Sequence, residues 1–326
     1  VGYYAGGAMT TGLQNTLIGG LAGDALTDAD YNVAVGTDAL AIDTLGSRSI
    51  AIGRRSLYTQ NFTTATDSYN IGVGFNAGYS VTTGLYNVLI GGLTGDALTD
   101  ADENVAVGTS ALGADTMGSK SVAIGASALN AQNFTTATDS YNTAVGYYAG
   151  VAVTTGVENT LMGGLAGDAL TDADYNVAIG YLALSGDTLG SRSVAIGRSA
   201  LQVQNFTTAT NAYNVAIGFQ CGDSVSTGIN NVLVGALVGD ALTDADYNVA
   251  VGHNALSTDT LGSRSTALGY SALNAQNFTT ATDTYNVGVG YNAGGNISTA
   301  THNTLIGGNA GTAITIGVRN TAVGSA

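Results

Sequence analysis

The sequence predicts an all-β fold, a parallel β-solenoid of about 18 coils, and three observations support this prediction. The phrase NVAVG at Asn32 returns at Asn104, as NVAIG at Asn176 and again at Asn248, with a constant step of 72 along the chain. Inside each block, a motif of a polar residue, three apolar residues and glycine recurs in steps of 17, 17, 21 and 17. The composition, with 48 glycines and neither proline nor tryptophan, is unlike that of a globular domain. A fixed internal period indicates a repeat architecture.

The first and last positions of the motif show what each coil requires. The motif begins at residues 15, 32, 49, 70, 87, 104, 121, 142, 159, 176, 193, 214, 231, 248, 265, 286, 303 and 320. Its first residue is Asn except at Ser49, Ser121, Ser193 and Ser265. Asn side chains in register can form an amide ladder that also satisfies the backbone at a turn. The fifth residue is always Gly, which indicates a positive φ or a close backbone approach.

The three residues between them form a short strand that is apolar on both faces. The first and third are β-branched or aliphatic and share one face, which we expect to line the coil interior. The middle residue is Ala or Gly in most coils and is leucine in five, namely Leu17, Leu89, Leu161, Leu233 and Leu305. A strand that is apolar on both faces is buried on both. The second face is covered by another chain or by the other half of the same coil; we favour an interface in a parallel homotrimer.

Length alone would suggest two domains, but the unbroken period predicts one continuous solenoid over residues 1–326 without an internal boundary. Neither end resembles the capping repeats that solenoids usually carry. We therefore expect a segment of a longer fibre.

The net charge limits the classes of binding partner, and the cysteine content bears on whether disulfide bonds are present. The net charge is −15 with only eight Lys and Arg, which disfavours nucleic acid and direct binding to anionic membranes. The single Cys221 stands where other blocks have Ala and is expected to be a small buried residue, so no disulfide framework is predicted.

Each of the longer coils carries four extra residues in the segment NFTTAT. We expect a projecting loop, and its candidate contact residues are Asn61, Phe62, Asn133, Phe134, Asn205, Phe206, Asn277 and Phe278. Repeated aromatic loops would suit multivalent contact with a cell-surface glycan or receptor, or with a neighbouring chain. The alternative, which we favour for the phenylalanines, is that each ring plugs the side of its coil or packs between adjacent protomers. Asn-Phe-Thr is also an N-glycosylation acceptor pattern.

The segment GDALTDAD places three carboxylates close together in the sequence. Oxygen ligands of this kind can bind Ca²⁺, and the candidates are Asp28, Asp30, Asp100 and Asp102. The spacing matches neither an EF-hand nor a β-roll calcium loop. We favour a solvated turn that maintains solubility, so no metal or other cofactor is expected, with calcium as the alternative.

A third column directly precedes the motif. It contains Tyr31, Tyr69, Tyr141, Tyr175, Tyr213, Tyr247 and Tyr285, interleaved with Arg48, Lys120, Arg192 and Arg264. Side chains one coil apart would lie within cation–π distance, which predicts an external ladder that stiffens the coils. A sugar-binding aromatic track is the alternative.

Catalysis is not expected. His253 and His302 occupy unrelated columns, and no nucleophile, metalloprotease or phosphate-loop pattern occurs. A glycosidase cleft with paired carboxylates would break the repeat at one place, and no such break is visible.

The segments NVAVGTSAL, SVAIGASAL and SVAIGRSAL resemble the head repeats of YadA-type trimeric autotransporter adhesins. NTAVGYYAG at Asn142 and NTLIGG at Asn303 are similar to repeats of phage tail fibres. The resemblance covers essentially the whole chain and implies a left-handed parallel β-roll, an intertwined homotrimer and a role in attachment. Adhesin repeats are usually shorter and lack a four-coil superperiod, so we favour the tail fibre and transfer no adhesin binding residue.

We therefore expect a structural and adhesive fibre segment, namely the shaft of a trimeric phage tail fibre. Such a shaft would mediate host attachment and would be located on a virion tail. The alternative is the head or stalk of a bacterial surface adhesin, which would be extracellular at the cell surface. A remoter alternative is an ice- or mineral-binding solenoid, which would need a flat Thr array on every coil, whereas the Thr residues cluster in the loops.

Overall fold

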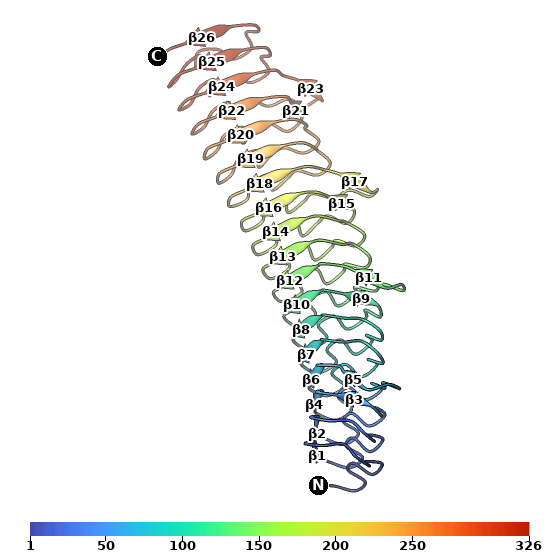
Figure 1. Ribbon diagram of the computed structural model, residues 1–326. Coiled ribbons are helices and arrows are strands. Elements are labelled where there is room, and N and C mark those ends of the chain that lie inside the picture. The colour runs from blue at the N-terminus through green and yellow to red at the C-terminus, as the bar shows by residue number, and fades with distance from the viewer. Residues whose placement is uncertain (326) are drawn as a thin grey trace. The chain divides into compact units, whose positions relative to one another are not determined.

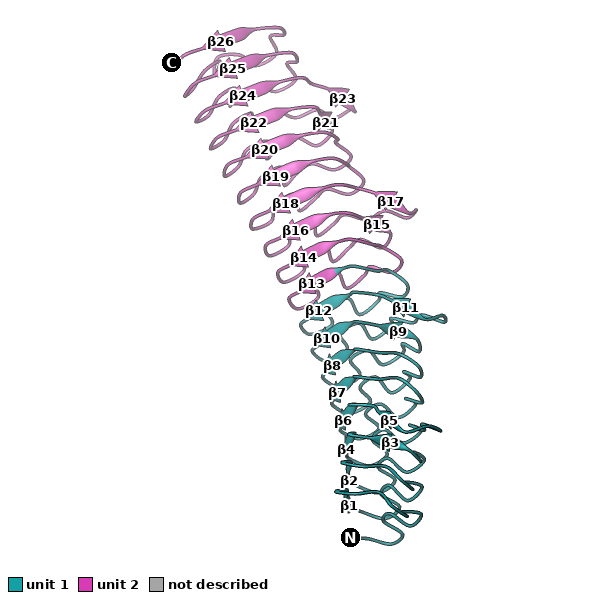
Figure 2. Cartoon of the chain, viewed as in Figure 1, with its two compact units in different colours: residues 1–159 teal, residues 160–326 magenta. Residues whose placement is uncertain are grey.

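The computed structural model describes residues 1–325 and shows a parallel β-solenoid of about 18 turns (Figure 1). The described residues contain strands, turns and bends but no helix. The chain divides into two compact units, Val1–Asn159 and Thr160–Ala326 (Figure 2). The predicted all-β solenoid is thus confirmed, and each unit is described in turn.

Unit 1 contains one three-residue strand in each motif and two pairs of two-residue strands. The three-residue strands are β1 (Thr16–Ile18), β2 (Val33–Val35), β4 (Ile50–Ile52), β6 (Ile71–Val73), β7 (Val88–Ile90), β8 (Val105–Val107), β10 (Val122–Ile124) and β12 (Thr143–Val145). The short pairs are β3 (Gly46–Ser47) with β5 (Thr66–Asp67), and β9 (Gly118–Ser119) with β11 (Thr138–Asp139).

Unit 2 repeats this arrangement. Its three-residue strands are β13 (Thr160–Met162), β14 (Val177–Ile179), β16 (Val194–Ile196), β18 (Val215–Ile217), β19 (Val232–Val234), β20 (Val249–Val251), β22 (Thr266–Leu268), β24 (Val287–Val289), β25 (Thr304–Ile306) and β26 (Thr321–Val323). Its short pairs are β15 (Gly190–Ser191) with β17 (Thr210–Asn211), and β21 (Gly262–Ser263) with β23 (Thr282–Asp283).

The strand register reproduces the sequence spacing. Val33 of β2 lies beside Ile50 of β4, which is the shorter step, whereas Ile50 lies beside Ile71 of β6, which is the longer one. Parallel strands therefore stay in register although one coil in four is longer. The four extra residues leave the coil as a loop directly before the short strands β5, β11, β17 and β23.

The glycine column meets both of its predicted requirements at once. Gly91 has φ 137°, and a Cβ added to it would lie 2.6 Å from the carbonyl oxygen of Gly108 in the next coil. The same contact joins Gly36 to Gly53 at 2.6 Å, with φ 135° at Gly36. A side chain would therefore be strained by the backbone conformation and would collide with the neighbouring backbone.

The predicted asparagine ladder is present and buried. The side-chain oxygen of Asn87 accepts a hydrogen bond from the backbone N–H of Asn104, at 3.1 Å. Its amide nitrogen donates to the carbonyl of Ala101 at 2.7 Å and to the side chain of Asn70 at 3.3 Å. Each asparagine thus joins its own coil to both neighbours and satisfies backbone groups that water does not reach.

The expected assignment of the two strand faces is wrong. The middle residue points into the coil, since Ala34, Ala51 and Ala106 are 0% exposed, while the first and third residues point outward. The leucines expected at an inter-chain contact are therefore core residues: Leu89, Leu161, Leu233 and Leu305 are fully buried, and Leu17 is half-buried.

The physical reason is an exchange of size between the middle residue of the strand and the turn residue eight positions after the start of the motif. Where the middle residue is Ala, as at Ala51, the interior is filled by a turn leucine such as Leu57. Where it is Leu89, glycines take the turn positions, and a Cβ on Gly78 or Gly95 would lie 2.7 or 2.8 Å from a Leu89 methyl carbon. This exchange of sizes explains why the leucines recur once in every four coils.

Candidate functional site

The most extensive feature exposed by the fold is the outward side of the strands, here called the outer sheet face. It consists of the first and third residues of each three-residue strand. In unit 1, Ile52, Ile90 and Ile124 are 38–39% exposed. In unit 2, Met162, Val251 and Ile306 are 38–41% exposed. Within each unit, the outer sheet face is therefore a stripe of half-exposed aliphatic side chains along in-register strands. Contiguous apolar stripes of this kind mark interaction surfaces.

The predicted Tyr–Arg ladder borders this stripe. In unit 1, the Arg48 guanidinium lies 4.8 Å from the ring centroid of Tyr31 and 5.8 Å from that of Tyr69. Tyr69 in turn stacks on Tyr86, with centroids 5.7 Å apart and ring planes 10° apart. Because neighbouring side chains cover the faces of these rings, the ladder is suited to stiffening the coils rather than to stacking on a sugar.

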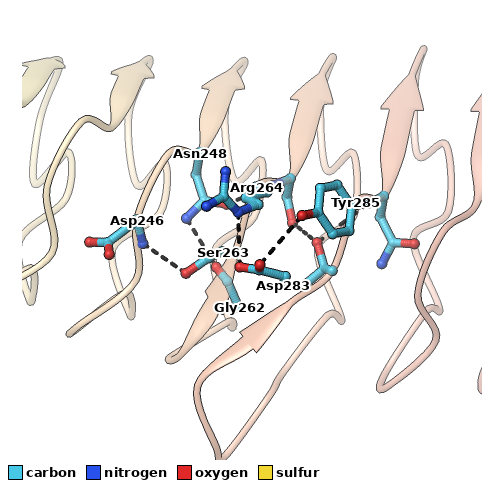
Figure 3. Close-up of polar contacts among 10 residues, drawn as sticks. Asp246, Asn248, Gly262, Ser263, Arg264, Asp283 and Tyr285 are labelled. Carbon is cyan, nitrogen blue, oxygen red and sulfur yellow. Dashed lines mark hydrogen bonds and ion pairs between the residues drawn. The ribbon is translucent and has the colours of Figure 1, made fainter.

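Unit 2 has the same cation–π arrangement, together with an ion pair between Arg264 and Asp283 that is drawn in Figure 3. Arg264 lies over the rings of Tyr247 and Tyr285 at 4.8 and 6.0 Å, and its Nε is 3.0 Å from a carboxylate oxygen of Asp283. The hydrogen bond to Asp283 raises the pKa of Arg264. In unit 1, Lys120 and Asp139 form the equivalent pair at 2.6 Å, which raises the pKa of Lys120 and lowers that of Asp139.

A second aromatic column lies on the other side of the stripe, directly after the motif glycine, and was missed at the sequence level. In unit 2, the His253 and Tyr270 rings stack with centroids 5.6 Å apart, and Tyr270 stacks on Tyr291 at 5.4 Å. In unit 1, Arg54 lies 5.7 Å from the Phe75 centroid. The residue at this position varies from Gly to Tyr along the chain. The only signal in the sequence for an aromatic column was that the position directly follows the invariant glycine.

The positive charges gather beside the outer sheet face. All eight Lys and Arg residues lie directly before the motif or in the two residues after its glycine: Arg48, Arg54, Arg55, Lys120, Arg192, Arg198, Arg264 and Arg319. Most of the 23 carboxylates lie in other turns. The apolar stripe is therefore the least acidic part of a strongly acidic chain.

The inserted loops project as predicted, but their phenylalanines do not. Phe62, Phe134, Phe206 and Phe278 are each 6% exposed. The ring of Phe134 covers Gly118, where an added Cβ would lie 2.7 Å from a ring carbon. The exposed tips are residues 63–65, 135–137, 207–209 and 279–281. The part of the favoured interpretation in which each Phe plugs the side of its coil agrees with this burial.

The asparagines that begin these loops differ slightly in exposure. Asn61 is half-buried, whereas Asn133, Asn205 and Asn277 are exposed. The side-chain oxygen of Asn133 accepts a hydrogen bond from the Thr116 hydroxyl at 3.1 Å. These side chains are therefore anchored to the preceding coil through their oxygens.

A buried polar cluster that the sequence analysis missed holds each loop in place. In the second copy, Asp115 is 0% exposed and accepts hydrogen bonds from the backbone N–H groups of Gly118 and Phe134, at 3.1 and 3.0 Å. The amide of Gln132 donates to Asp115 at 2.6 Å and to Ser121 at 2.9 Å. The cluster recurs around Asp43, Asp187 and Asp259. The replacement of Asn by Ser at the start of the motif in these coils was the available signal, because the smaller residue makes room for the Gln amide.

The calcium candidates have structural partners. Asp28 accepts a hydrogen bond from the Thr11 hydroxyl at 2.5 Å, and Asp30 accepts one from the backbone N–H of Leu13 at 2.6 Å. Asp100 and Asp102 make the same bonds to the preceding coil, at 2.6 and 2.7 Å. No group of three or more metal-ligating side chains is found within residues 1–325.

The remaining candidates for chemistry are dispersed. His253 stacks on Tyr270, and His302 lies beside Tyr285 with centroids 5.1 Å apart. Cys221 is buried, its thiol donates to the carbonyl of Leu233 at 3.2 Å, and burial raises its pKa to about 12. Across residues 1–325 no pocket is found, and no helix in this range could cross a membrane.

These features define the class of protein by its fold, a parallel β-solenoid with an exposed apolar sheet face. No protein-family model, curated protein or solved structure was found to match the chain.

Proposed function

We propose that the chain is a structural segment of an attachment fibre that assembles with copies of itself through the outer sheet face, as the shaft of a trimeric phage tail fibre. The observation that carries this proposal is the exposed aliphatic stripe within each unit. An apolar surface of that extent is stabilised when another apolar surface removes it from water.

Charge supports a second copy as the occupant. The chain has a net charge of −15, so two copies repel each other across most orientations. Contact through the outer sheet face keeps the acidic GDALTDAD turns of the two copies apart, and the Lys and Arg residues beside that face are paired with carboxylates of their own chain, as in Arg48–Asp67 and Lys120–Asp139. The proposal of a trimer, and of a phage tail fibre as the structure that contains it, rests on the resemblance of the repeats to those of tail fibres and trimeric adhesins.

Replacing outward side chains tests the self-association. The double variant Ile90→Asp and Ile124→Asp places charges on the outer sheet face without touching the core of unit 1. Light scattering on purified protein should show a multimer for the unmodified chain and a monomer for the variant, with unchanged circular dichroism. Thr136→Asp, at an exposed loop tip, is the matched control and should leave the mass unchanged. A multimer that survives the double variant would refute the use of this face.

For attachment, we propose that the loop tips contact the host surface. Two identical tips in one unit lie four coils apart, or roughly 19 Å at the spacing of adjacent strands. Such an array favours multivalent binding, in which several weak contacts to ligands such as glycans act together. Substituting Thr64, Thr136, Thr208 and Thr280 by Glu should reduce adsorption of particles that carry the chain, whereas Asp28→Asn and its copies should not. Equal adsorption by both variants would show that the loop tips are not part of the binding surface.

Immunogold labelling tests the setting. Antibodies against the purified chain should label virion tails in lysates of a culture that carries its gene. Label confined to the cell envelope would instead favour the surface adhesin.

A further inference from the structure

The turn column nine positions after the start of each motif contains one departure from the four-coil repeat. Asp24, Asp96, Asp168 and Asp240 are copies of one another in this column. Asp223, one coil before Asp240, stands where the other blocks have Tyr79, Val151 and Gly295. Only here do two consecutive coils both carry a carboxylate in this column.

The two carboxylates are neighbours in the structure of unit 2. The backbone N–H of Val203 donates to the carbonyl of Asp223, and that of Ser224 donates to the carbonyl of Asp240, both at 3.1 Å. These bonds place Asp223 and Asp240 at equivalent positions of adjacent coils, where the spacing is about 4.8 Å. Side chains at equivalent positions of in-register parallel coils lie side by side.

Each carboxylate has one oxygen that is buried and has no hydrogen-bond partner, Oδ1 in both cases. Two ionised carboxylates at this separation repel each other, and a buried acceptor without a donor is costly. A single proton removes both penalties, because a protonated carboxyl group can donate to the carboxylate beside it.

We propose that Asp223 and Asp240 share one proton, which makes this turn of unit 2 a carboxyl–carboxylate pair that is tightened by mild acid. The proton comes from solvent and resides on one Oδ1, and the O–H bond donates to the Oδ1 of the partner. The only covalent bond formed is this O–H bond, and the solvent hydronium that supplies the proton becomes water. The inference concerns unit 2 alone and is independent of the proposed assembly.

The surrounding charged and titratable groups are consistent with the pair. Burial raises the pKa of both carboxyl groups, and the proximity of Asp223 raises that of Asp240 further. Arg198 is the cation that acts on Asp223, and it lowers the pKa of Asp223. Its guanidinium lies over the Phe219 ring, 5.6 Å from the centroid, and forms no ion pair with Asp223 within the described coils. The thiol of Cys221, which also senses Asp240, is neutral because its pKa is raised to about 12. Gln202 and Ser257 occupy the same column in the flanking coils.

A double-mutant cycle on the full chain tests the sharing. Asp223→Asn and Asp240→Asn each replace one carboxylate with an amide that can donate to the other, as the shared proton does. Each single variant should raise Tm at pH 7, by about 2 °C for a unit of this size. The double variant should gain no more than one single variant. In the control cycle, Asp168→Asn with Asp240→Asn, the effects should add, because these residues are four coils apart and do not touch.

Proton uptake provides an independent measurement. As pH falls from 7, proton uptake by the unmodified chain should begin at a higher pH than proton uptake by the Asp223→Asn variant. Additive effects of Asp223→Asn and Asp240→Asn, a lower Tm at pH 7 for both single variants, or proton uptake that begins at the same pH in both proteins would each overturn the proposal.

Discussion

Gly91→Ala should destabilise unit 1 strongly, whereas the same substitution at the neighbouring Gly92 should not. At Gly91 the new Cβ would meet the Gly108 carbonyl oxygen at 2.6 Å, and φ is 137°. At Gly92 a Cβ would find nothing within 4 Å. The two variants have the same composition and differ by one position, so each is the control for the other.

The magnitude follows from two contributions at Gly91. Holding alanine in this backbone region costs about 1–3 kcal/mol. Relieving the collision requires shifts of packed backbone, which cost about another 1–3 kcal/mol. Together the free energy of unfolding should fall by about 2–6 kcal/mol. Gly92→Ala should change it by no more than about 1 kcal/mol, with a gain from the reduced entropy of the unfolded chain.

Urea unfolding followed by circular dichroism measures this difference. Gly91→Ala should shift the midpoint to lower urea concentration, while Gly92→Ala should leave it near that of the unmodified protein. Equal midpoints for the two variants would mean that close coil spacing does not impose the glycine column.

Three further predictions concern the core, the loop anchor and the buried acids. In the monomeric Ile90→Asp and Ile124→Asp background, Leu89→Ala should cost about 2–5 kcal/mol in urea unfolding because it leaves a cavity, whereas Ile52→Ala on the outer sheet face should cost far less; equal costs would contradict the observed faces. Asp115→Ala should remove the acceptor for the N–H groups of Gly118, Phe134 and the Gln132 side chain, and should therefore speed hydrogen exchange in residues 133–138. Unchanged exchange would show that Asp115 does not anchor the loop. Burial raises the pKa of Asp96 and Asp168 above the ordinary 3.8, so they favour folding most below pH 3.8 and lose that contribution as pH rises through their folded pKa values. The contribution of these two residues, measured as the difference in urea midpoint from the Asp96→Asn and Asp168→Asn variant, should become less favourable as pH rises from 3.8, and the opposite trend would refute this sign.

The repeat positions could be predicted because each imposes a backbone requirement on every coil. Gly91 needs both a special φ and a close approach, which leaves an invariant glycine column. Asn87 satisfies three partners, and its column is Asn except for the four Ser residues in the coils with the buried Gln cluster. The short and long steps of the motif became the strand register unchanged.

The strand faces could not be predicted from alternation alone, because the pattern shows which residues share a face but not which face is inside. The deciding information lay in the turns. Leu57 has φ 48°, an uncommon conformation for leucine, and from there it fills the space beside Ala51. Without that knowledge, the small middle residues suggested close contact with another chain.

The polar clusters were missed for a different reason. Asp115 and Gln132 are one full coil apart in the sequence and have no local motif, and only the coil register brings them together. The Tyr–Arg ladder was predicted because its members lie in one column beside the motif. Contacts within one column can therefore be predicted from the period, whereas contacts between columns require the coil cross-section.

Sedimentation equilibrium of the purified chain measures most directly whether the outer sheet face joins copies of this chain. We expect a single species of about three times the 32.3 kDa mass of one chain, with no dissociation on dilution through the micromolar range. A stable species of 32.3 kDa at all concentrations would contradict it.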